Sequence, residues 1–167
     1  MNTSTAGIPK AGLPEGFVYI DELIEDCIID AKYAGTDNFM GRPAAGYEQP
    51  LVVMSRELAD CCIKAADTLR KQGYIARRSG HTRAKAVDLT IVDMHTHQEL
   101  DMGSIFDYMD SRSNHGAAGL TPQQEKNRAI LRDAMLGAGM TLYEGEWWHY
   151  NVNPEPYPDT FFNFPIK

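Results

Sequence analysis

The spacing of hydrophobic residues and of capping residues predicts two helices. From Ser55 to Gln72, apolar side chains recur every three or four residues, as on one buried face of a helix. Ser55 is a suitable N-cap for this helix, and Gly73 ends it. A second helix is predicted over Thr121–Leu136, because the segment begins with a threonine N-cap, a proline at the first helical position and a capping-box glutamine at the third.

Alternating hydrophobic and polar residues predict strands next to these helices. The residues of Ala86–Asp93 alternate, so Asp88 is expected on the face opposite the apolar side chains. Met140–Tyr143 and Trp147–Asn151 are predicted to be two strands joined by a turn at Glu144-Gly145. Together these elements predict one α+β domain with a mainly antiparallel sheet packed by helices.

Proline and glycine set the expected N-terminal boundary of this domain. Residues 1–16 contain two prolines, three glycines and few large apolar side chains, so we predict a flexible arm over 1–16 and a single domain over 17–167. At the other end, the segment Phe161–Phe164 is too apolar for a free tail. We expect it to pack on the domain.

Composition and charge indicate a globular protein and limit the kinds of partner it can bind. With 43% hydrophobic residues the chain is globular, and its formal charge of -7 argues against nucleic acid or an anionic membrane as a partner. A small cationic or zwitterionic ligand is compatible with that charge. The three cysteines are odd in number and do not require a disulfide framework. The segment Met1–Phe17 has neither a basic n-region nor a continuous apolar h-region, and no hydrophobic run approaches the length that spans a membrane. We therefore predict a cytoplasmic protein, and the sequence leaves its oligomeric state open.

Two short segments offer side chains for a metal site. The first contains His81 and Asp88, and the second contains Glu146 and His149. A catalytic zinc typically takes three such ligands and keeps one position open for water, whose proton a nearby carboxylate can accept. Either pair alone is a weak signal, because a capped loop or a buried structural histidine would use the same residues. If both pairs form one site, three side chains satisfy the ligand count and Glu146 stays outside the coordination of the metal.

The spacing of Glu146 and His149 adds a geometric condition. Residues three apart on an ideal strand point to opposite faces, yet these two side chains must reach the same site. We therefore predict a bend, a bulge or the start of a strand between them. The site itself is expected on the concave side of the sheet.

Several motifs resemble those of one known family, and they occur in order from Phe17 to the C-terminus. The similar segments are Asp30-Ala31-Lys32-Tyr33-Ala34, Gly46-Tyr47, Ser79 to Asp88 with His81 between them, Asp101-Met102-Gly103-Ser104 with Phe106-Asp107, Glu146-Trp147-Trp148-His149-Tyr150 and Glu155-Pro156-Tyr157-Pro158. They look like the zinc D-alanyl-D-alanine dipeptidases of the vancomycin-resistance type, within the wider group of zinc D,D-peptidases.

The resemblance implies a metal site and a reaction. It implies one zinc ion per chain, held by His81, Asp88 and His149, with Glu146 as general base and general acid. The implied reaction is hydrolysis of the zwitterionic dipeptide D-Ala-D-Ala to two D-alanines, which has a place in cell-wall peptidoglycan chemistry.

The resemblance also implies contacts with the substrate. Ser79 and Asp107 match positions that hold its ammonium group, and Tyr33 and Tyr47 match residues near the substrate pocket. From the residues alone, the two tyrosines could equally cover an edge of the core, and Asp107 could be a turn or cap carboxylate. A fixed acceptor for a free ammonium would favour a dipeptide over a longer peptide.

Two departures from the family pattern leave alternatives open. Ala84 stands where the family has glycine, and between Gly73 and Arg78 the chain lacks a segment with an arginine that stabilises the oxyanion. The chain is then a naturally short or engineered variant, or a piece of it is omitted, or a nearby cation, Arg77 or Arg78, replaces that arginine. The alternative functions are a catalytically impaired zinc and peptide-binding module, and a D,D-carboxypeptidase that acts on longer cell-wall peptides.

Overall fold

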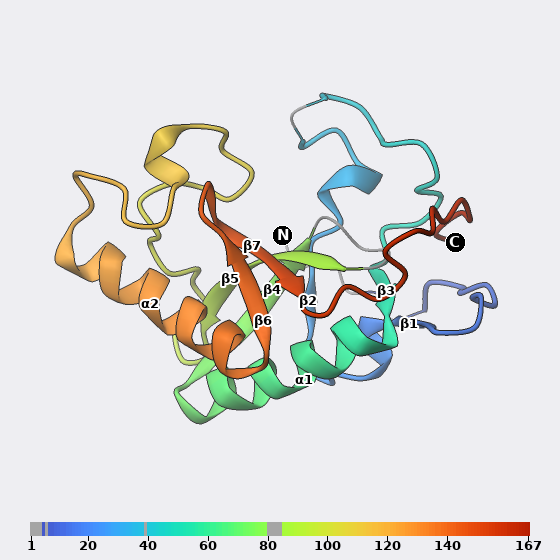
Figure 1. Ribbon diagram of the computed structural model, residues 1–167, viewed down its shortest axis with the longest axis horizontal. Coiled ribbons are helices and arrows are strands. Elements are labelled where there is room, and N and C mark those ends of the chain that lie inside the picture. The colour runs from blue at the N-terminus through green and yellow to red at the C-terminus, as the bar shows by residue number, and fades with distance from the viewer. Residues whose placement is uncertain (1–4, 6, 39, 80–84) are drawn as a thin grey trace.

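A five-stranded sheet organises the computed structural model, which describes residues 5, 7–38, 40–79 and 85–167 (Figure 1). Its strand order is β2-β4-β5-β7-β6. Strand β2 pairs with β4 in parallel, and the three other pairs are antiparallel. The strands are β2 (Ile28–Ile29), β4 (Tyr74–Ser79), β5 (Ala86–Asp93), β6 (Met140–Tyr143) and β7 (Glu146–Val152).

Two helices, α1 (Arg56–Lys71) and α2 (Pro122–Gly137), begin at the predicted caps. The side chain of Ser55 accepts a hydrogen bond from the backbone N–H of Leu58. At the start of α2, Thr121 and Gln124 form a complete capping box, in which each side chain accepts from the backbone N–H of the other residue. The predicted helices are therefore confirmed, as is the α+β class with a mostly antiparallel sheet.

Both helices pack on the same face of the sheet. Val87, Leu89 and Ile91 of β5 belong to one buried cluster with apolar side chains of both helices, and Figure 1 shows the helices side by side. Because side chains alternate along a strand, Asp88 and Thr90 point to the opposite face, as predicted. A buried carboxylate is thus placed on the face of the sheet away from the helices.

The C-terminal segment packs against a smaller, two-stranded sheet. It pairs β1 (Phe17–Tyr19) with β3 (Val53–Ser55), and the ring of Phe17 packs edge-on against Phe162 and Phe164 at centroid distances of 4.6 and 5.0 Å. The expected packing of the C-terminal tail is correct for these two rings. It is wrong for Phe161, which is fully exposed because neighbouring residues of an extended segment point in opposite directions.

The described part of the predicted N-terminal arm contacts the domain. The backbone N–H of Ala11 donates to the carbonyl of Lys167, and Lys10 forms ion pairs with Asp21 and Glu22. Ile8 and Leu13 pack against the cluster around the small sheet. The flexibility of the arm stays a prediction.

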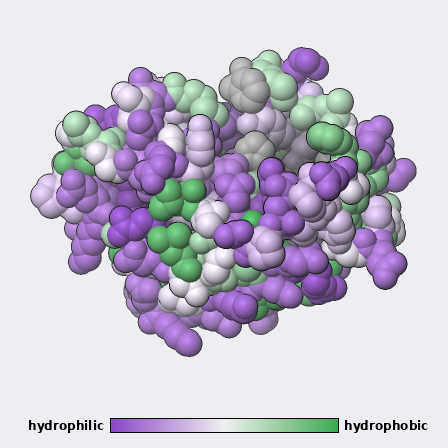
Figure 2. All heavy atoms as spheres, in the orientation of Figure 1, coloured by the Kyte–Doolittle hydropathy of each residue, from purple (hydrophilic) through white to green (hydrophobic). Residues whose placement is uncertain are grey.

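Short 3-10 helices and loops complete the fold. They are η1 (Ile20–Glu22), η2 (Lys32–Ala34) and η3 (Ser111–Ser113). The face in Figure 2 is mostly hydrophilic, with small separate hydrophobic areas. Within the described residues, no helix is both long enough and apolar enough to cross a membrane.

Candidate functional site

Three of the predicted site residues meet on the face of the sheet away from the helices. Asp88 of β5 pairs directly with His149 of β7, and the imidazole Nδ1 lies 2.9 Å from the Asp88 Oδ1. The Glu146 Oε2 lies 3.7 Å from the same nitrogen. One potential ligand atom from each residue lies within 4.8 Å of the others. This is the only such group of three or more among the described residues.

The local backbone explains how residues three apart converge. Glu146 is the first residue of β7, where the pairing between β6 and β7 shifts register at Leu142 and Tyr143. The alternation of an ideal strand therefore does not extend to Glu146, and its carboxylate can reach the side of the sheet that His149 occupies. The predicted irregularity between the two residues is confirmed.

Burial and charge make this cluster a suitable host for a cation. Asp88 is almost fully buried, and His149 and Glu146 are partly buried. Burial lowers the pKa of His149, but the hydrogen bond and charge of Asp88, together with the charge of Glu146, outweigh it and raise the pKa overall. Two carboxylates and an imidazole form a donor set that divalent zinc accepts.

The fourth predicted metal-site residue, His81, falls outside the described residues. It belongs to 80–84, which also contains Ala84, so its role as a ligand and the effect of Ala84 stay predictions. The strands on either side of this segment are described. Ser79 ends β4 and pairs with Asp88 of β5, so the last described residue before 80–84 lies next to the cluster.

An aromatic ring at the end of β6 packs on His149. The rings of Tyr143 and His149 are edge to face, with centroids 5.9 Å apart. Gly145 allows this arrangement, because a Cβ at this position would lie 2.9 Å from the Cε1 of Tyr143. The turn therefore carries Glu146 and also restricts the orientation of the imidazole.

The predicted substrate residues lie close to one another. The hydroxyl of Tyr33 donates to the carboxylate of Asp107 at 3.3 and 3.4 Å, and the backbone N–H of Lys32 donates to the Ser79 Oγ at 3.3 Å. Burial raises the pKa of Tyr33 above its ordinary value, and the negative charges of Asp107 and Asp88 raise it further, as does Tyr47 to a smaller extent. Tyr33 thus lies within electrostatic reach of both the metal cluster and the other substrate residues.

Asp107 lies on a loop that α2 and β7 hold in place. Its φ of 66° is in the left-handed region, which is uncommon for residues other than glycine but is tolerated best by Asn and Asp. From α2, Arg128 donates hydrogen bonds to the carbonyls of Met102, Arg112 and Asn114, at 2.7, 2.9 and 2.9 Å. The loop is therefore fixed on both sides of Asp107.

Strand β7 supports the same loop. The indole N–H of Trp147 donates to the Ser104 Oγ at 2.9 Å, and that oxygen lies 3.1 Å from the Ser113 Oγ. Ser113 in turn donates to the carbonyl of Tyr108, the residue after Asp107, at 2.6 Å. The strand that carries Glu146 and His149 is thus linked to the predicted ammonium acceptor.

Several residues that shape this site were not predicted from the sequence. Lys32 packs over the ring of Phe106, with its Nζ 4.1 Å from the ring centroid, next to Asp107. Arg128 was also missed, although a signal existed. Gln124, Arg128 and Leu131 are spaced four and three residues apart, as on one face of a helix. The signal was therefore a charged residue, Arg128, on the helix face that is buried.

Neither of the two proposed substitute arginines is oriented for an oxyanion at this cluster. Arg77 shares a strand face with Ser79, but its guanidinium binds Asp30 at 2.6 Å and Glu99 at 3.1 Å. Arg78 points to the opposite face, where it is buried and donates to the Cys27 Sγ at 3.3 Å. The hypothesis that either residue replaces the family arginine has no support in this arrangement.

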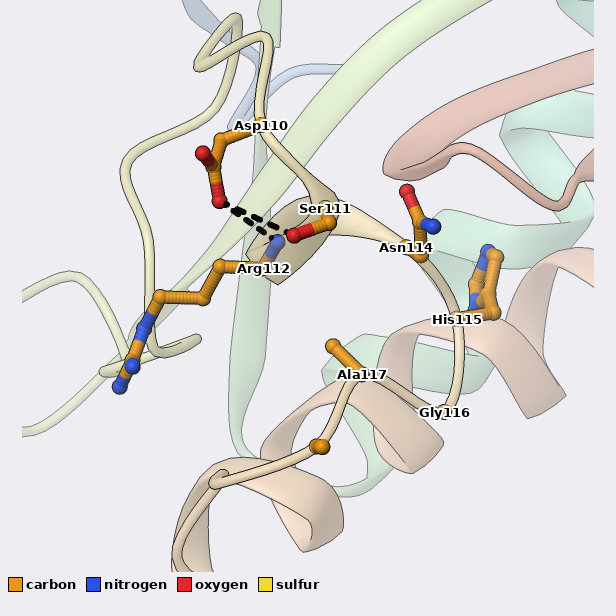
Figure 3. Close-up of a pocket in the computed structure, with 8 residues that line it drawn as sticks. Asp110, Ser111, Arg112, Asn114, His115, Gly116 and Ala117 are labelled. Atoms are coloured by element: carbon orange, nitrogen blue, oxygen red, sulfur yellow. Dashed lines mark hydrogen bonds between the residues drawn. The ribbon is translucent and has the colours of Figure 1, made fainter.

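A separate pocket of about 560 Å³ lies in the loop after Asp107 (Figure 3). Residues of the segment 110–118 line it, and none of them is a predicted site residue. Asp110 accepts hydrogen bonds from Arg112 N and Ser111 Oγ, at 2.9 and 3.5 Å, and these bonds define one wall of the pocket. The backbone N–H of His115 donates to the carbonyl of Glu144, so this loop also contacts the turn that precedes Glu146.

Comparison with known proteins gives a consistent result. A family model described as D-ala-D-ala dipeptidase matches residues 75–167. D-alanyl-D-alanine dipeptidases from Enterococcus faecium and Enterococcus faecalis are 34% and 33% identical to the chain, covering 91% and 93% of it and 98% and 100% of the relatives. The enzyme of the same name from Streptomyces coelicolor is 32% identical, over 90% of this chain and 98% of its own length.

The alignments also bear on the segment that the chain was predicted to lack. The alignment with the Enterococcus faecium protein extends over 199 residues, more than the 167 residues of this chain, so the relative contains residues that have no counterpart here. The similarity nevertheless covers nearly the whole of both proteins. The chain therefore belongs to the D-Ala-D-Ala dipeptidase family and is a peptidase of the metal-dependent type.

Proposed function

We propose that this chain hydrolyses the dipeptide D-Ala-D-Ala to two D-alanines with one zinc ion. The observation that carries the proposal is the convergence of Asp88, Glu146 and His149, whose potential ligand atoms lie within 4.8 Å of one another. Asp88 and His149 would hold the ion, and His81 is assigned as the third ligand from its place in the motif. Bound zinc would supply Lewis-acid polarisation of the scissile carbonyl and would lower the pKa of water.

Glu146 is the proposed general base and general acid. Its carboxylate is on the same side of the sheet as His149, 3.7 Å from the Nδ1, and it is only partly exposed. It can accept the proton of the attacking water and then deliver that proton to the nitrogen of the leaving D-alanine. The low exposure of the cluster limits competition from bulk water for this proton.

The proposed substrate is a zwitterion whose ammonium binds at Asp107. Asp107 and Tyr33 are in contact, and Ser79 neighbours them through Lys32. Tyr47 is near enough to Tyr33 to raise its pKa slightly. A carboxylate that requires a free ammonium disfavours longer peptides, because an internal peptide nitrogen carries no charge to pair with it.

The relatives support the dipeptidase assignment over the two alternatives. Three proteins named D-alanyl-D-alanine dipeptidase match along nearly their whole length. The residues that the Enterococcus faecium relative has and this chain lacks would suit an impaired binding module, so a turnover measurement decides between these two functions. All three cysteines are free, which fits the predicted cytoplasmic location.

Release of D-alanine from D-Ala-D-Ala by the purified, zinc-supplied protein tests this function. Glu146→Gln should lower kcat by about 100-fold or more, the scale of general acid-base catalysis, while the zinc content stays the same. Glu144→Gln is the matched control, because it makes the same change two residues earlier at an exposed position of the same turn. Unchanged turnover in Glu146→Gln would contradict the role of Glu146.

The same assay separates the alternatives. A wild-type protein that binds zinc and the dipeptide but releases no D-alanine would be an impaired binding module. Faster hydrolysis of tripeptides and pentapeptides ending in D-Ala-D-Ala than of the dipeptide itself would instead identify a carboxypeptidase.

A further inference from the structure

The two ring nitrogens of His149 face two different oxygen atoms. Nδ1 lies 2.9 Å from the Asp88 Oδ1, and Nε2 lies 3.4 Å from the side-chain Oδ1 of Asn151. His149 and Asn151 are two apart in β7, so their side chains are on the same face of the strand. The imidazole is therefore oriented by an oxygen at each end.

The position of Asn151 is set by strands on both sides. It pairs with Ala86 of β5 and with Thr141 of β6, and the hydroxyl of Thr141 donates to the Asn151 carbonyl at 3.4 Å. A backbone held between two strands has little freedom to move its side chain away from His149. The amide oxygen is thus a fixed acceptor on the side of the imidazole away from Asp88 and Glu146.

A histidine binds a metal through the nitrogen that carries no proton, while the other ring N–H usually donates to a nearby oxygen. Both carboxylates of the cluster lie on the Nδ1 side. We propose, on the basis of the proposed zinc function, that Asn151 is a positioning residue that accepts the Nε2–H of His149 and so presents Nδ1 to the metal. The geometry assigns this role to Asn151 in addition to the family motif, which ends one residue earlier at Tyr150.

Zinc affinity, measured by competition with a chromogenic chelator, tests the positioning role. Asn151→Leu keeps a similar side-chain size but removes the oxygen, and it should weaken zinc binding about 10- to 100-fold, the usual effect of losing such a partner. Asn151→Asp restores an oxygen acceptor and should recover most of the affinity. Thr141→Val is the control, because it perturbs the same strand pair without touching His149, and it should bind zinc like the wild type.

Proton exchange at the imidazole tests the hydrogen bond without metal. The Nε2 of His149 lies 3.4 Å from the Asn151 Oδ1, and its N–H is followed in the metal-free protein by ¹⁵N-edited NMR. This proton should exchange slowly with water in the wild type and in Thr141→Val, and rapidly in Asn151→Leu. A purely structural contribution of Asn151 would change the unfolding midpoint but not this exchange.

The outcomes separate this inference from the proposed function. Equal zinc affinity and equal exchange in the wild type and Asn151→Leu would overturn the role of Asn151, even if the wild type hydrolyses D-Ala-D-Ala. If the wild type binds no zinc, the proposed function fails, and the exchange measurement alone decides: rapid exchange in the metal-free wild type overturns the inference. Weak zinc binding by Asn151→Leu with recovery in Asn151→Asp supports it.

Discussion

Asp107 combines an unusual backbone with a charge that the proposed substrate requires. Its φ of 66° restricts the residues that fit this position, and its carboxylate accepts from Tyr33. Asn tolerates the same backbone and has nearly the same shape, but it carries no charge. Asp107→Asn therefore tests the charge alone.

We expect Asp107→Asn to lower kcat/KM for D-Ala-D-Ala by about 10- to 100-fold. A hydrogen bond to a charged group contributes roughly 1.5–3 kcal/mol, and each 1.4 kcal/mol changes a binding constant about tenfold. The effect should come mainly from KM, because the ammonium carries the same charge in the bound substrate and in the transition state. Tyr33→Phe removes one donor to Asp107 and should have a smaller effect; a normal KM in Asp107→Asn would show that the ammonium binds elsewhere.

Short sequence motifs allowed part of the site to be predicted. Asp88, Glu146 and His149 were predicted together because each lies in a short motif, and these side chains do converge. Asn151 and Lys32 were missed, because a single amide or ammonium in a strand or loop has no distinctive spacing. Their roles depend on distances to side chains from other parts of the chain.

At the scale of elements, α2 supports the loop that carries Asp107. The buried guanidinium of Arg128 donates to three carbonyls of that loop, at Met102, Arg112 and Asn114. The stability of the helix and the position of Asp107 are therefore linked.

Arg128→Met should lower the free energy of unfolding by about 3 kcal/mol, because it leaves the buried carbonyl of Met102 and two partly buried carbonyls without a donor, at roughly 1–3 kcal/mol each. Chemical denaturation in urea measures the change. Arg132→Met, at a partly exposed position of the same helix where the side chain pairs only with exposed Asp133, is the control and should cost less than about 1 kcal/mol. Equal destabilisation by both variants would contradict the special role of Arg128.

Elements with local signals were predicted well, and those defined by distant partners were not. Caps and glycines placed both helices, and alternation placed β5. The two-residue strand β2 exists only through its parallel pairing with β4, which no local pattern indicates. The exposure of Phe161 was missed for the same reason, since a run of apolar residues does not show which ring faces the core.

At the scale of the whole molecule, sheet order creates the metal cluster. Asp88 and His149 are 61 residues apart, and they meet because β7 pairs with β5 on one side and with β6 on the other. The sequence predicted these strands but not their order, because pairing partners are chosen by the packing of the whole domain. A metal that bridges β5 and β7 would therefore stabilise the fold as well as the reaction.

Removing zinc should lower the midpoint of thermal unfolding. A ligand at 100 times its Kd stabilises the folded state by about 2.7 kcal/mol. For a domain of this size, roughly 2–4 °C per kcal/mol gives a shift of about 5–10 °C between zinc-loaded and chelator-treated protein. Differential scanning fluorimetry at fixed protein concentration measures it.

The site that causes the shift can be identified with two variants. His149→Gln removes the proposed ligand on β7, which lies opposite Asp88 of β5. It should abolish most of the zinc-dependent shift in the unfolding midpoint. His95 and His97 are exposed in a turn after β5 and are the obvious competing surface site, so the double variant His95→Gln with His97→Gln should keep the full shift. An ion held at that turn would join no distant strands and would stabilise the fold little. Loss of the shift in the double variant but not in His149→Gln would therefore place the zinc outside the cluster of Asp88, Glu146 and His149.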